Sequence, residues 1–244
     1  MVPLGHGGLR GPPHAGLCFA RWWPPARVSG RAGDSAPLSG HNLYDHSVMS
    51  AATVLTDRFD RALLYATHVH GGQVRKETTI PYVAHLLAVA ATVLEYGGSE
   101  DMAIAGLLHD AAEDQGGEPR LADIRNRFGD RVADIVRACS DSVANTAAGQ
   151  QKEDWRTRKM RYKEHLKTVD KETRLVALSD KAHNARSILR DLRKPEIGPA
   201  VWSRFGKRPK EDTPYRQVAT AFQELLPGQL AEELMEIVIV LENE

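Results

Sequence analysis

Residues 104–114 read IAGLLHDAAED and place four titratable side chains at the end of an apolar helical run. Ionised groups are rarely left against a hydrophobic segment without an opposite charge or a metal, because removing them from water is costly. The pair His109-Asp110 offers a nitrogen and an oxygen ligand, and Glu113-Asp114 follows about one helical turn later. The segment therefore predicts a helix, running from Ser99 towards Gly116, that carries a metal centre near its C-terminal end.

Two further segments offer ligands of the same kind. His85 ends the stretch PYVAH, and Asp180 lies within LSDKAHN. With the pair at 109–110 they make a set of two histidines and two aspartates. The two cysteines, Cys18 and Cys139, are too few and too far apart to suggest a disulfide framework or a thiolate zinc site, and they fit a reducing compartment. We therefore expect a cytoplasmic protein.

Composition limits the class of partner. The 244 residues are 42% hydrophobic, enough for one domain with a real core. The 32 basic and 32 acidic residues cancel, so no overall field attracts nucleic acid or an anionic membrane. No window approaches the roughly twenty apolar residues of a membrane span. An anionic ligand must therefore be held by a local group of cations.

The periodicity of the chain changes near residue 49. Residues 1–48 are rich in Gly, Pro and Arg without helical or strand periodicity, which predicts a disordered extension, and Met49 is an alternative start. Residues 49–244 are expected to form one domain. Apolar stripes of helical spacing recur there, including a helix opened by Pro81 and a long one from Leu175 to Leu189. With no strand alternation, the pattern predicts an all-α bundle.

Four motifs carry a family resemblance. Arg75-Lys76, PYVAH, LLHDAAED and SDKAHN, in this order and separation, resemble the HD-domain metal phosphohydrolases. Within that group they are most similar to the hydrolase domain of RelA/SpoT proteins and to the small alarmone hydrolases. The resemblance covers roughly residues 56–192. It implies an all-α HD-domain bundle, a divalent ion that is usually manganese, and removal of the 3′-pyrophosphate of ppGpp or pppGpp by attack of a metal-bound water.

The resemblance also implies roles for individual residues. The expected metal ligands are His85, His109, Asp110 and Asp180. The expected catalytic carboxylates, which orient the water and move its proton, are Glu113 and Asp114. The expected substrate-binding residues are Arg75, Lys76, Tyr82 and Asn184. Four protein ligands leave about two positions open on an octahedral ion, as a catalytic site requires.

Other polar residues receive weaker expectations. His68, His70 and His183 are left outside the metal set, with His68 expected at the surface. Arg158-Lys159 could reach a second pyrophosphate, and Arg204, Lys207, Arg208 and Tyr215 could close over the site, but runs of this kind are more often solvated helix faces or loops.

The chain departs from the family pattern at positions around the first histidine. Leu86 follows the first histidine where relatives commonly have proline, Thr79-Ile80 replaces a glycine-containing pair, and Val74 stands where arginine is frequent. These changes spare the expected ligands but alter the loop that would hold guanine. Two alternatives therefore stay open, namely hydrolysis of another nucleotide such as NADPH, and a nucleotide sensor without turnover. Intact Glu113-Asp114 argues against the sensor.

Overall fold

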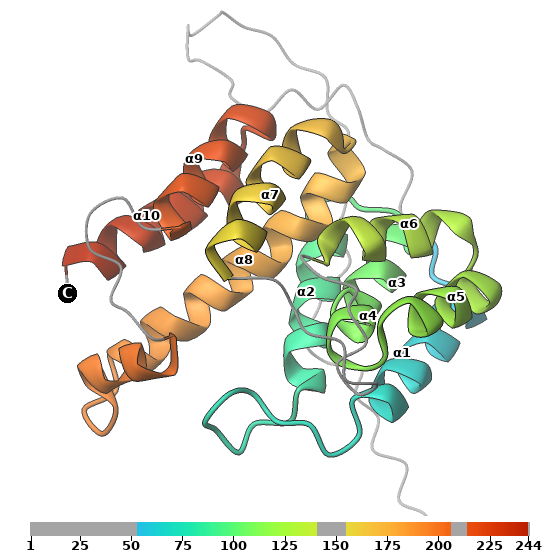
Figure 1. Cartoon of the computed structure of the whole chain (residues 1–244), viewed down its shortest axis with the longest axis horizontal. Helices are drawn as coiled ribbons and strands as arrows, with labels where there is room; N and C mark the ends of the chain where they lie inside the picture. The colour runs from blue at the N-terminus through green and yellow to red at the C-terminus, as the bar shows by residue number, and fades with distance from the viewer. Residues whose placement is uncertain (1–52, 141–154, 206–213, 244) are drawn as a thin grey trace, which may run out of the picture. The chain divides into compact units, whose positions relative to one another are not determined.

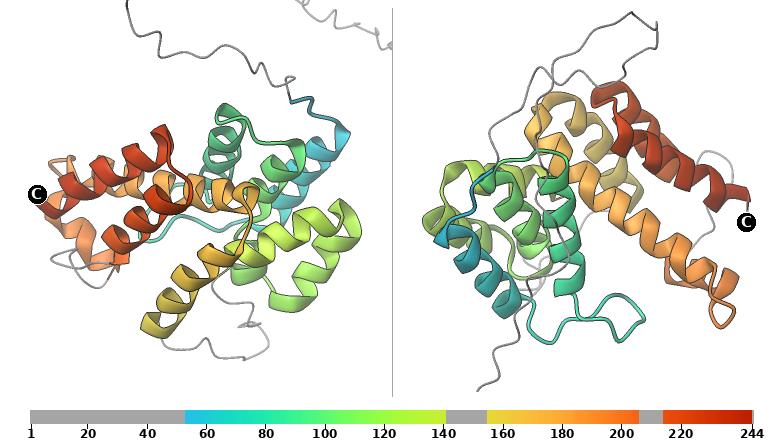
Figure 2. Two further views of the ribbon diagram at one scale, coloured as in Figure 1. Left: turned by 90° about the horizontal axis from the view of Figure 1, so that it is seen from above. Right: turned by 180° about the vertical axis from the view of Figure 1, so that it is seen from behind.

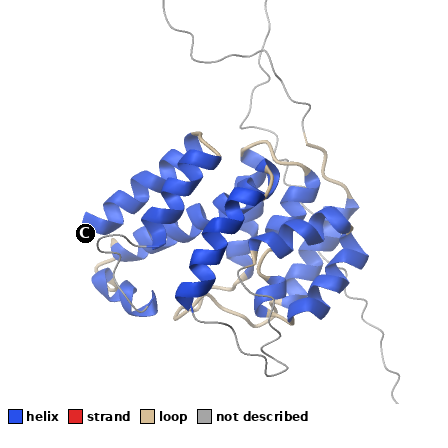
Figure 3. Cartoon of the chain, turned by 45° about the horizontal axis from the view of Figure 1, so that its top comes forward, coloured by secondary structure: helices blue, strands red, loops and turns tan. Residues whose placement is uncertain are grey.

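The computed structural model describes residues 53–140, 155–205 and 214–243, all of which fall within one unit, Met49–Glu244. Every regular element among them is a helix (Figure 3). The described backbone pairs in β fashion at a single isolated bridge, between Val74 and Pro81. The predicted all-α fold is confirmed, while the expectations on residues 1–48, Met49 and Cys18 lie outside the described residues.

Six helices build the N-terminal part of this unit (Figure 1). They are α1 (Asp57–Val69), α2 (Val83–Glu95), α3 (Glu100–Leu108), α4 (Ala111–Asp114), α5 (Gly117–Phe128) and α6 (Asp130–Cys139). Their apolar faces enclose a first core. Helix α3 runs through its middle, and every residue from Met102 to Leu108 is buried. A helix surrounded on all sides reads as apolar all round, which explains the uninterrupted segment before His109.

The C-terminal part encloses a second core. It contains α7 (Trp155–Thr168), α8 (Lys171–Leu192), the 3-10 helix η2 (Gly198–Phe205), α9 (Pro214–Leu225) and α10 (Gln229–Asn243). Helix α8 contacts α2, α3 and α6 on one side and α9 and α10 on the other, as the two further views show (Figure 2). It therefore joins the two cores, and residues along it can meet side chains from the N-terminal helices.

Two predicted helix boundaries are wrong. The helix expected to continue from Ser99 to Gly116 ends at Leu108, and α4 is a separate turn. The Gly106 carbonyl, which would accept the backbone N–H of Asp110 in a continuous helix, accepts the His109 ring at 2.8 Å instead. The helix expected to open at Pro81 begins at Val83, because Pro81 is used in the bridge to Val74.

Gly106 sets the spacing between α2 and α3. A Cβ atom at this position would lie 3.2 Å from the Ala90 Cα and 3.3 Å from the Ala90 nitrogen. Both neighbours are helix backbone and cannot move aside cheaply, so glycine permits a close approach of the two helix axes. That approach brings the first turn of α2, with His85, towards the end of α3, with His109.

Candidate functional site

Three helical segments bring the expected metal ligands to one buried point. His85 lies in the first turn of α2, His109 follows the last residue of α3, and Asp180 lies midway along α8. Their exposed fractions are 1%, 2% and 7%, respectively. One potential ligand atom from each lies within 4.8 Å of the other two. Residues separated by up to 95 positions therefore form a set able to hold a metal ion.

Asp110 lies beside this set. Its Oδ2 is 3.0 Å from Nε2 of His109 and 3.5 Å from Nε2 of His85. The nearer carboxylate oxygen of Asp180 is 3.3 Å from His85 Nε2 and 3.7 Å from His109 Nε2. The two imidazoles therefore face both carboxylates, and all four expected ligands come together.

Hydrogen bonds to the far side of each imidazole orient the rings. His109 Nδ1 lies 2.8 Å from the Gly106 carbonyl, which can only accept, so Nδ1 carries a proton. His85 Nδ1 lies 2.7 Å from Nδ1 of His183. Both Nε2 atoms are buried, and neither has a hydrogen-bond partner in the described part of the chain. Such bonds behind metal-binding histidines fix the tautomer that presents Nε2, so the residues present fit an ion at this point.

The charges at the site favour a cation. Burial alone would lower the pKa of His109, but Asp110 and Asp180 hold that pKa well above its usual value. Burial would likewise raise the pKa of Asp180, yet the neighbouring ammonium of Lys181, 2.5 Å from its Oδ2, keeps that pKa well below the ordinary range. Burial would also raise the pKa of Asp110, but His109 keeps that pKa well below the ordinary range. Both aspartates are therefore ionised, and they provide the negative charge that a divalent ion needs.

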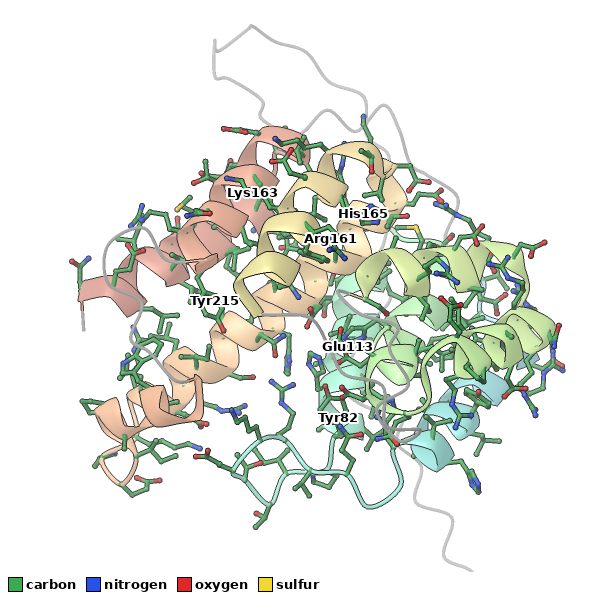
Figure 4. All side chains as sticks on the ribbon, viewed as in Figure 1. Tyr82, Glu113, Arg161, Lys163, His165 and Tyr215 are labelled. Carbon is green, nitrogen blue, oxygen red and sulfur yellow. The ribbon has the colours of Figure 1, made fainter. Side chains whose placement is uncertain are left out.

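Tyr82 contacts the metal set from the loop before α2. Its hydroxyl donates to Oδ2 of Asp110 at 2.7 Å, and burial, followed by Asp110, raises the pKa of the phenol. The ring stacks on His70 at 5.1 Å and meets His85 edge-on at 5.6 Å. Figure 4 shows Tyr82 and Glu113 in the same part of the molecule. Tyr82 lines the adjoining cavity and also holds a ligand side chain, a contact that the sequence did not indicate.

Asn184 lies one turn beyond Asp180 on α8. Its Nδ2 donates to Asp180 Oδ1 at 2.5 Å, and its Oδ1 accepts from Nη2 of Arg75 at 2.7 Å. Asn184, expected to bind substrate, therefore also contacts Asp180, one of the expected metal ligands.

The two expected catalytic carboxylates lie on α4. The backbone N–H of Asp114 donates to the Asp110 carbonyl at 2.9 Å, so the one-turn relation between these residues survives the break in the helix. The Gln73 amide donates to Oδ2 of Asp114 at 3.0 Å and accepts from the Gln115 amide at 2.7 Å. Glu113 is half-buried and Asp114 exposed, so both are more accessible than the ligands.

A cavity of about 360 Å³ adjoins the ligands. Its walls include cationic side chains and polar groups from the loop before α2, from α8 and from α9. These are Arg75, Lys76, His183, Asn184, Arg190 and Tyr215. A local group of cations in a chain of zero net charge is suited to an anionic ligand.

Three residues of this site were missed or left without a role. His183, kept outside the metal set, orients His85. Gln73 contacts Asp114. The only sequence feature that could have indicated this contact is the position of Gln73, two residues before Arg75. Lys181 follows Asp180 directly, which is also the pattern of a surface ion pair, but its side chain is half-buried against the Asp180 carboxylate. His68 is exposed, as expected.

Several residues with weaker expected roles lie outside the described part of the chain. The side chains of Arg158, Lys159 and Arg204, together with residues 207 and 208, lie outside what the structure describes. Tyr215 is described and lines the cavity (Figure 4). Cys139 is a free thiol whose pKa is raised by burial. No helix among the described residues is long and apolar enough to cross a membrane.

Comparison with known proteins identifies the class. A family model described as HD domain matches residues 36–209. The MESH1 protein of Xenopus tropicalis, named guanosine-3′,5′-bis(diphosphate) 3′-pyrophosphohydrolase, is 33% identical over 142 residues, which are 57% of this chain and 70% of that protein. The chain therefore belongs to the HD-domain family.

Two further comparisons agree with this assignment. A protein of Aquifex aeolicus with the same enzyme name is 33% identical over 132 residues, 54% of this chain, but this chain spans only 18% of that protein. A solved structure, described as a metazoan ortholog of SpoT that hydrolyses ppGpp, matches with a TM-score of 0.56 and 24% identity. The match covers 78% of this chain and 98% of that one, and at this identity it supports the fold.

Proposed function

We propose that the chain hydrolyses guanosine 3′,5′-bis(diphosphate) and its triphosphate analogue, and that residues 49–244 form the hydrolase domain. The observation that carries this proposal is the convergence of His85, His109 and Asp180 within 4.8 Å beside a cavity with cationic walls. Relatives that bear the name of this pyrophosphohydrolase support the choice of substrate. A small nucleotide in the cytoplasm, rather than nucleic acid or a membrane, also agrees with the balanced charge and the two cysteines.

The proposed cofactor is a divalent ion held by His85, His109, Asp110 and Asp180. Nitrogen and carboxylate ligands without thiolate suit manganese, with geometry and availability deciding among similar ions. When bound, such an ion polarises a phosphoryl oxygen and lowers the pKa of a coordinated water. Because the contacts at Nδ1 already orient both imidazoles, the four proposed ligands need little rearrangement to bind the ion.

Glu113 and Asp114 are proposed to handle the proton of the reacting water. One oxygen–phosphorus bond forms from water, and the bond between the 3′-oxygen and phosphorus breaks, which leaves GDP or GTP and pyrophosphate. The proton lost by the water passes to a carboxylate, and the leaving 3′-oxygen gains one. Gln73, which donates to Asp114, orients that carboxylate.

The cavity is proposed to hold the remaining phosphates and the nucleoside. Arg75 and Lys76 enter it from the loop before α2, and Arg190 from α8. Guanidinium and ammonium groups form charge-assisted hydrogen bonds with phosphate oxygens. Tyr82, Asn184 and Tyr215 complete the wall and are proposed to border the nucleoside.

The test is a substrate panel with manganese-loaded protein. Guanosine tetraphosphate, NADPH and common nucleotides are incubated separately, and products are identified by mass and by pyrophosphate or phosphate release. We expect GDP and pyrophosphate from guanosine tetraphosphate. Phosphate from NADPH, with guanosine tetraphosphate untouched, would replace the substrate assignment, and binding of guanosine tetraphosphate without any product would favour a sensor.

A further inference from the structure

Arg75 contacts two protein side chains that come from different elements. Its Nη2 donates to Asn184 Oδ1 at 2.7 Å, and its guanidinium carbon lies 5.7 Å from the centre of the Tyr82 ring. Asn184 belongs to α8 and Tyr82 to the turn before α2. Arg75 is therefore a point at which these two elements meet beside the cavity.

The contact with Asn184 continues to one aspartate ligand. Asn184 Nδ2 donates to Asp180 Oδ1 at 2.5 Å. A guanidinium can only donate and an ionised carboxylate can only accept, so the amide has a single satisfactory orientation, with its oxygen towards Arg75 and its nitrogen towards Asp180. Without Arg75, the amide loses the bond that selects this orientation.

The contact with Tyr82 continues to the other aspartate ligand. The Tyr82 hydroxyl donates to Asp110 Oδ2 at 2.7 Å. The ring is confined by the His70 ring, stacked at 5.1 Å, and by the Arg75 guanidinium, a cation over an aromatic ring. Removing the guanidinium would therefore loosen the phenol that holds Asp110.

Backbone hydrogen bonds hold Arg75 in place for both contacts. The Arg75 N–H donates to the Ile80 carbonyl at 2.8 Å, and the Tyr82 N–H donates to the Gln73 carbonyl at 2.9 Å. With the bridge between Val74 and Pro81, these bonds pair the two sides of the loop. An ordered turn therefore holds the backbone of Arg75, and its side chain can take this position before a ligand binds.

We propose that Arg75 is a positioning residue for the metal centre, which holds Asp180 through Asn184 and Asp110 through Tyr82 before any nucleotide binds. This inference rests on the proposed metal site but not on the identity of the substrate. It gives Arg75 a role distinct from phosphate binding, since both paths end on carboxylates that face the two histidines.

Electrostatics alone predicts the opposite effect of removing Arg75. A guanidinium near a divalent ion repels it, so loss of the positive charge should tighten metal binding. Loss of the two supports should weaken it, because groups behind metal ligands commonly contribute about 10-fold to 100-fold in affinity. The direction of the change in manganese affinity therefore separates the two roles.

The experiment measures the affinity of the full chain for Mn²⁺ by titration calorimetry, without nucleotide. We expect Arg75→Ala to weaken binding about tenfold, the lower end of the range for residues behind ligands. Arg190→Ala is the matched control, because Arg190 lines the same cavity and carries the same charge, but its guanidinium pairs with Asp191 at 3.7 Å. The Mn²⁺ affinity of Arg190→Ala should equal or slightly exceed that of the wild type. Arg75→Lys, which keeps the charge but lacks the planar fork, should resemble Arg75→Ala.

Double mutants test the two paths. In an Asn184→Ala background, Arg75→Ala should weaken Mn²⁺ binding less than it does in the wild type, because the path to Asp180 is already lost. In a Tyr82→Phe background the effect of Arg75→Ala should also be smaller, because the path to Asp110 is lost. Circular dichroism and melting temperature check that each variant is folded. Unchanged or tighter Mn²⁺ binding in folded Arg75→Ala would overturn the inference. A failure to hydrolyse guanosine tetraphosphate would overturn only the proposed function, since no nucleotide enters this measurement.

Discussion

The proposed metal ligands and the residues proposed to face the nucleotide are held by different kinds of structure. His85, His109 and Asp180 are buried where α2, α3 and α8 pack together, so the apolar cores fix their positions. Arg75 and Lys76 lie on a loop, half-buried and exposed, and hydrogen bonds shape that loop. Changes in the loop should therefore act on nucleotide binding directly, and on the metal site only through Arg75 and its contacts with Asn184 and Tyr82. The departures from the family pattern at residues 74, 79 and 80 fall in the loop.

Removal of one proposed ligand should have the largest effect on the site. We expect His109→Ala and Asp180→Ala to lose bound metal and to reduce turnover to background while remaining helical, because one ligand of four is gone from a convergent site. Elemental analysis, circular dichroism and a pyrophosphate assay measure the three properties. His68→Ala, an exposed histidine on α1, is the control and should behave as wild type. Full metal content and full activity in either ligand variant would contradict the assignment.

Substitution of the α4 carboxylates separates chemistry from binding. Glu113→Gln and Asp114→Asn should retain manganese and nucleotide but lose about 10²-fold or more in kcat, if these groups take the proton of the water. Lys76→Ala should act mainly on KM, since a phosphate contact made in both ground and transition states is uniform binding. Steady-state kinetics with guanosine tetraphosphate gives both constants. Wild-type kcat in both carboxylate variants would exclude this mechanism.

The sequence predicts the proposed ligands and the fold, but not the contacts that hold the ligands. The ligands follow from a motif, because titratable residues inside apolar helical stripes need a reason to be there. The all-α fold follows from the same stripes. The contacts behind the ligands do not follow, since the His183 bond to His85 and the Tyr82 bond to Asp110 join residues 98 and 28 positions apart. The helix break after Leu108 was missed because the His109 ring replaces a backbone donor, a competition that periodicity does not reveal.

His183 tests whether support from behind the ligands is as important as the ligands themselves. With His85 presenting Nε2 to the ion, its Nδ1 carries the proton and His183 Nδ1 accepts it. His183→Ala removes that acceptor, which leaves a buried donor without a partner or lets the proton move to Nε2, where it blocks the metal. We expect manganese affinity to fall about tenfold. His183→Gln, whose amide oxygen can accept the same proton, should recover part of the loss. Nitrogen chemical shifts of His85 report its tautomer, and an unchanged tautomer with unchanged affinity in His183→Ala would refute the role.

The smallest effect is expected from a change at the N-terminus of α8, at its N-cap Asp170. This change tests whether the stability of the helix alone affects the site. Asp170 caps α8 by accepting from the Thr173 N–H at 2.8 Å, and it pairs with Arg131 at 2.8 Å. That hydrogen bond to Arg131 is the main reason that the pKa of Asp170 is lowered to about 2. Asp170→Ala should cost about 1 kcal/mol of unfolding free energy, mostly the cap, because solvent screens the exposed ion pair.

The pH dependence of this contribution has a definite sign. A carboxyl with a folded pKa near 2 and an unfolded pKa near 3.9 stabilises the fold fully above about pH 5, and this stabilisation is lost as the pH falls through 4 towards 2. Urea unfolding of Asp170→Ala and wild type should therefore differ at pH 7 and converge near pH 2. Glu172→Ala is the control, because Glu172 also pairs with Arg131 but does not cap the helix, and it should change stability less. Since Asp170 lies ten residues before Asp180, metal affinity should be unchanged in Asp170→Ala at pH 7. A loss of metal in this variant would mean that the site depends on the stability of the whole of α8 rather than on the packing around His85 and His109.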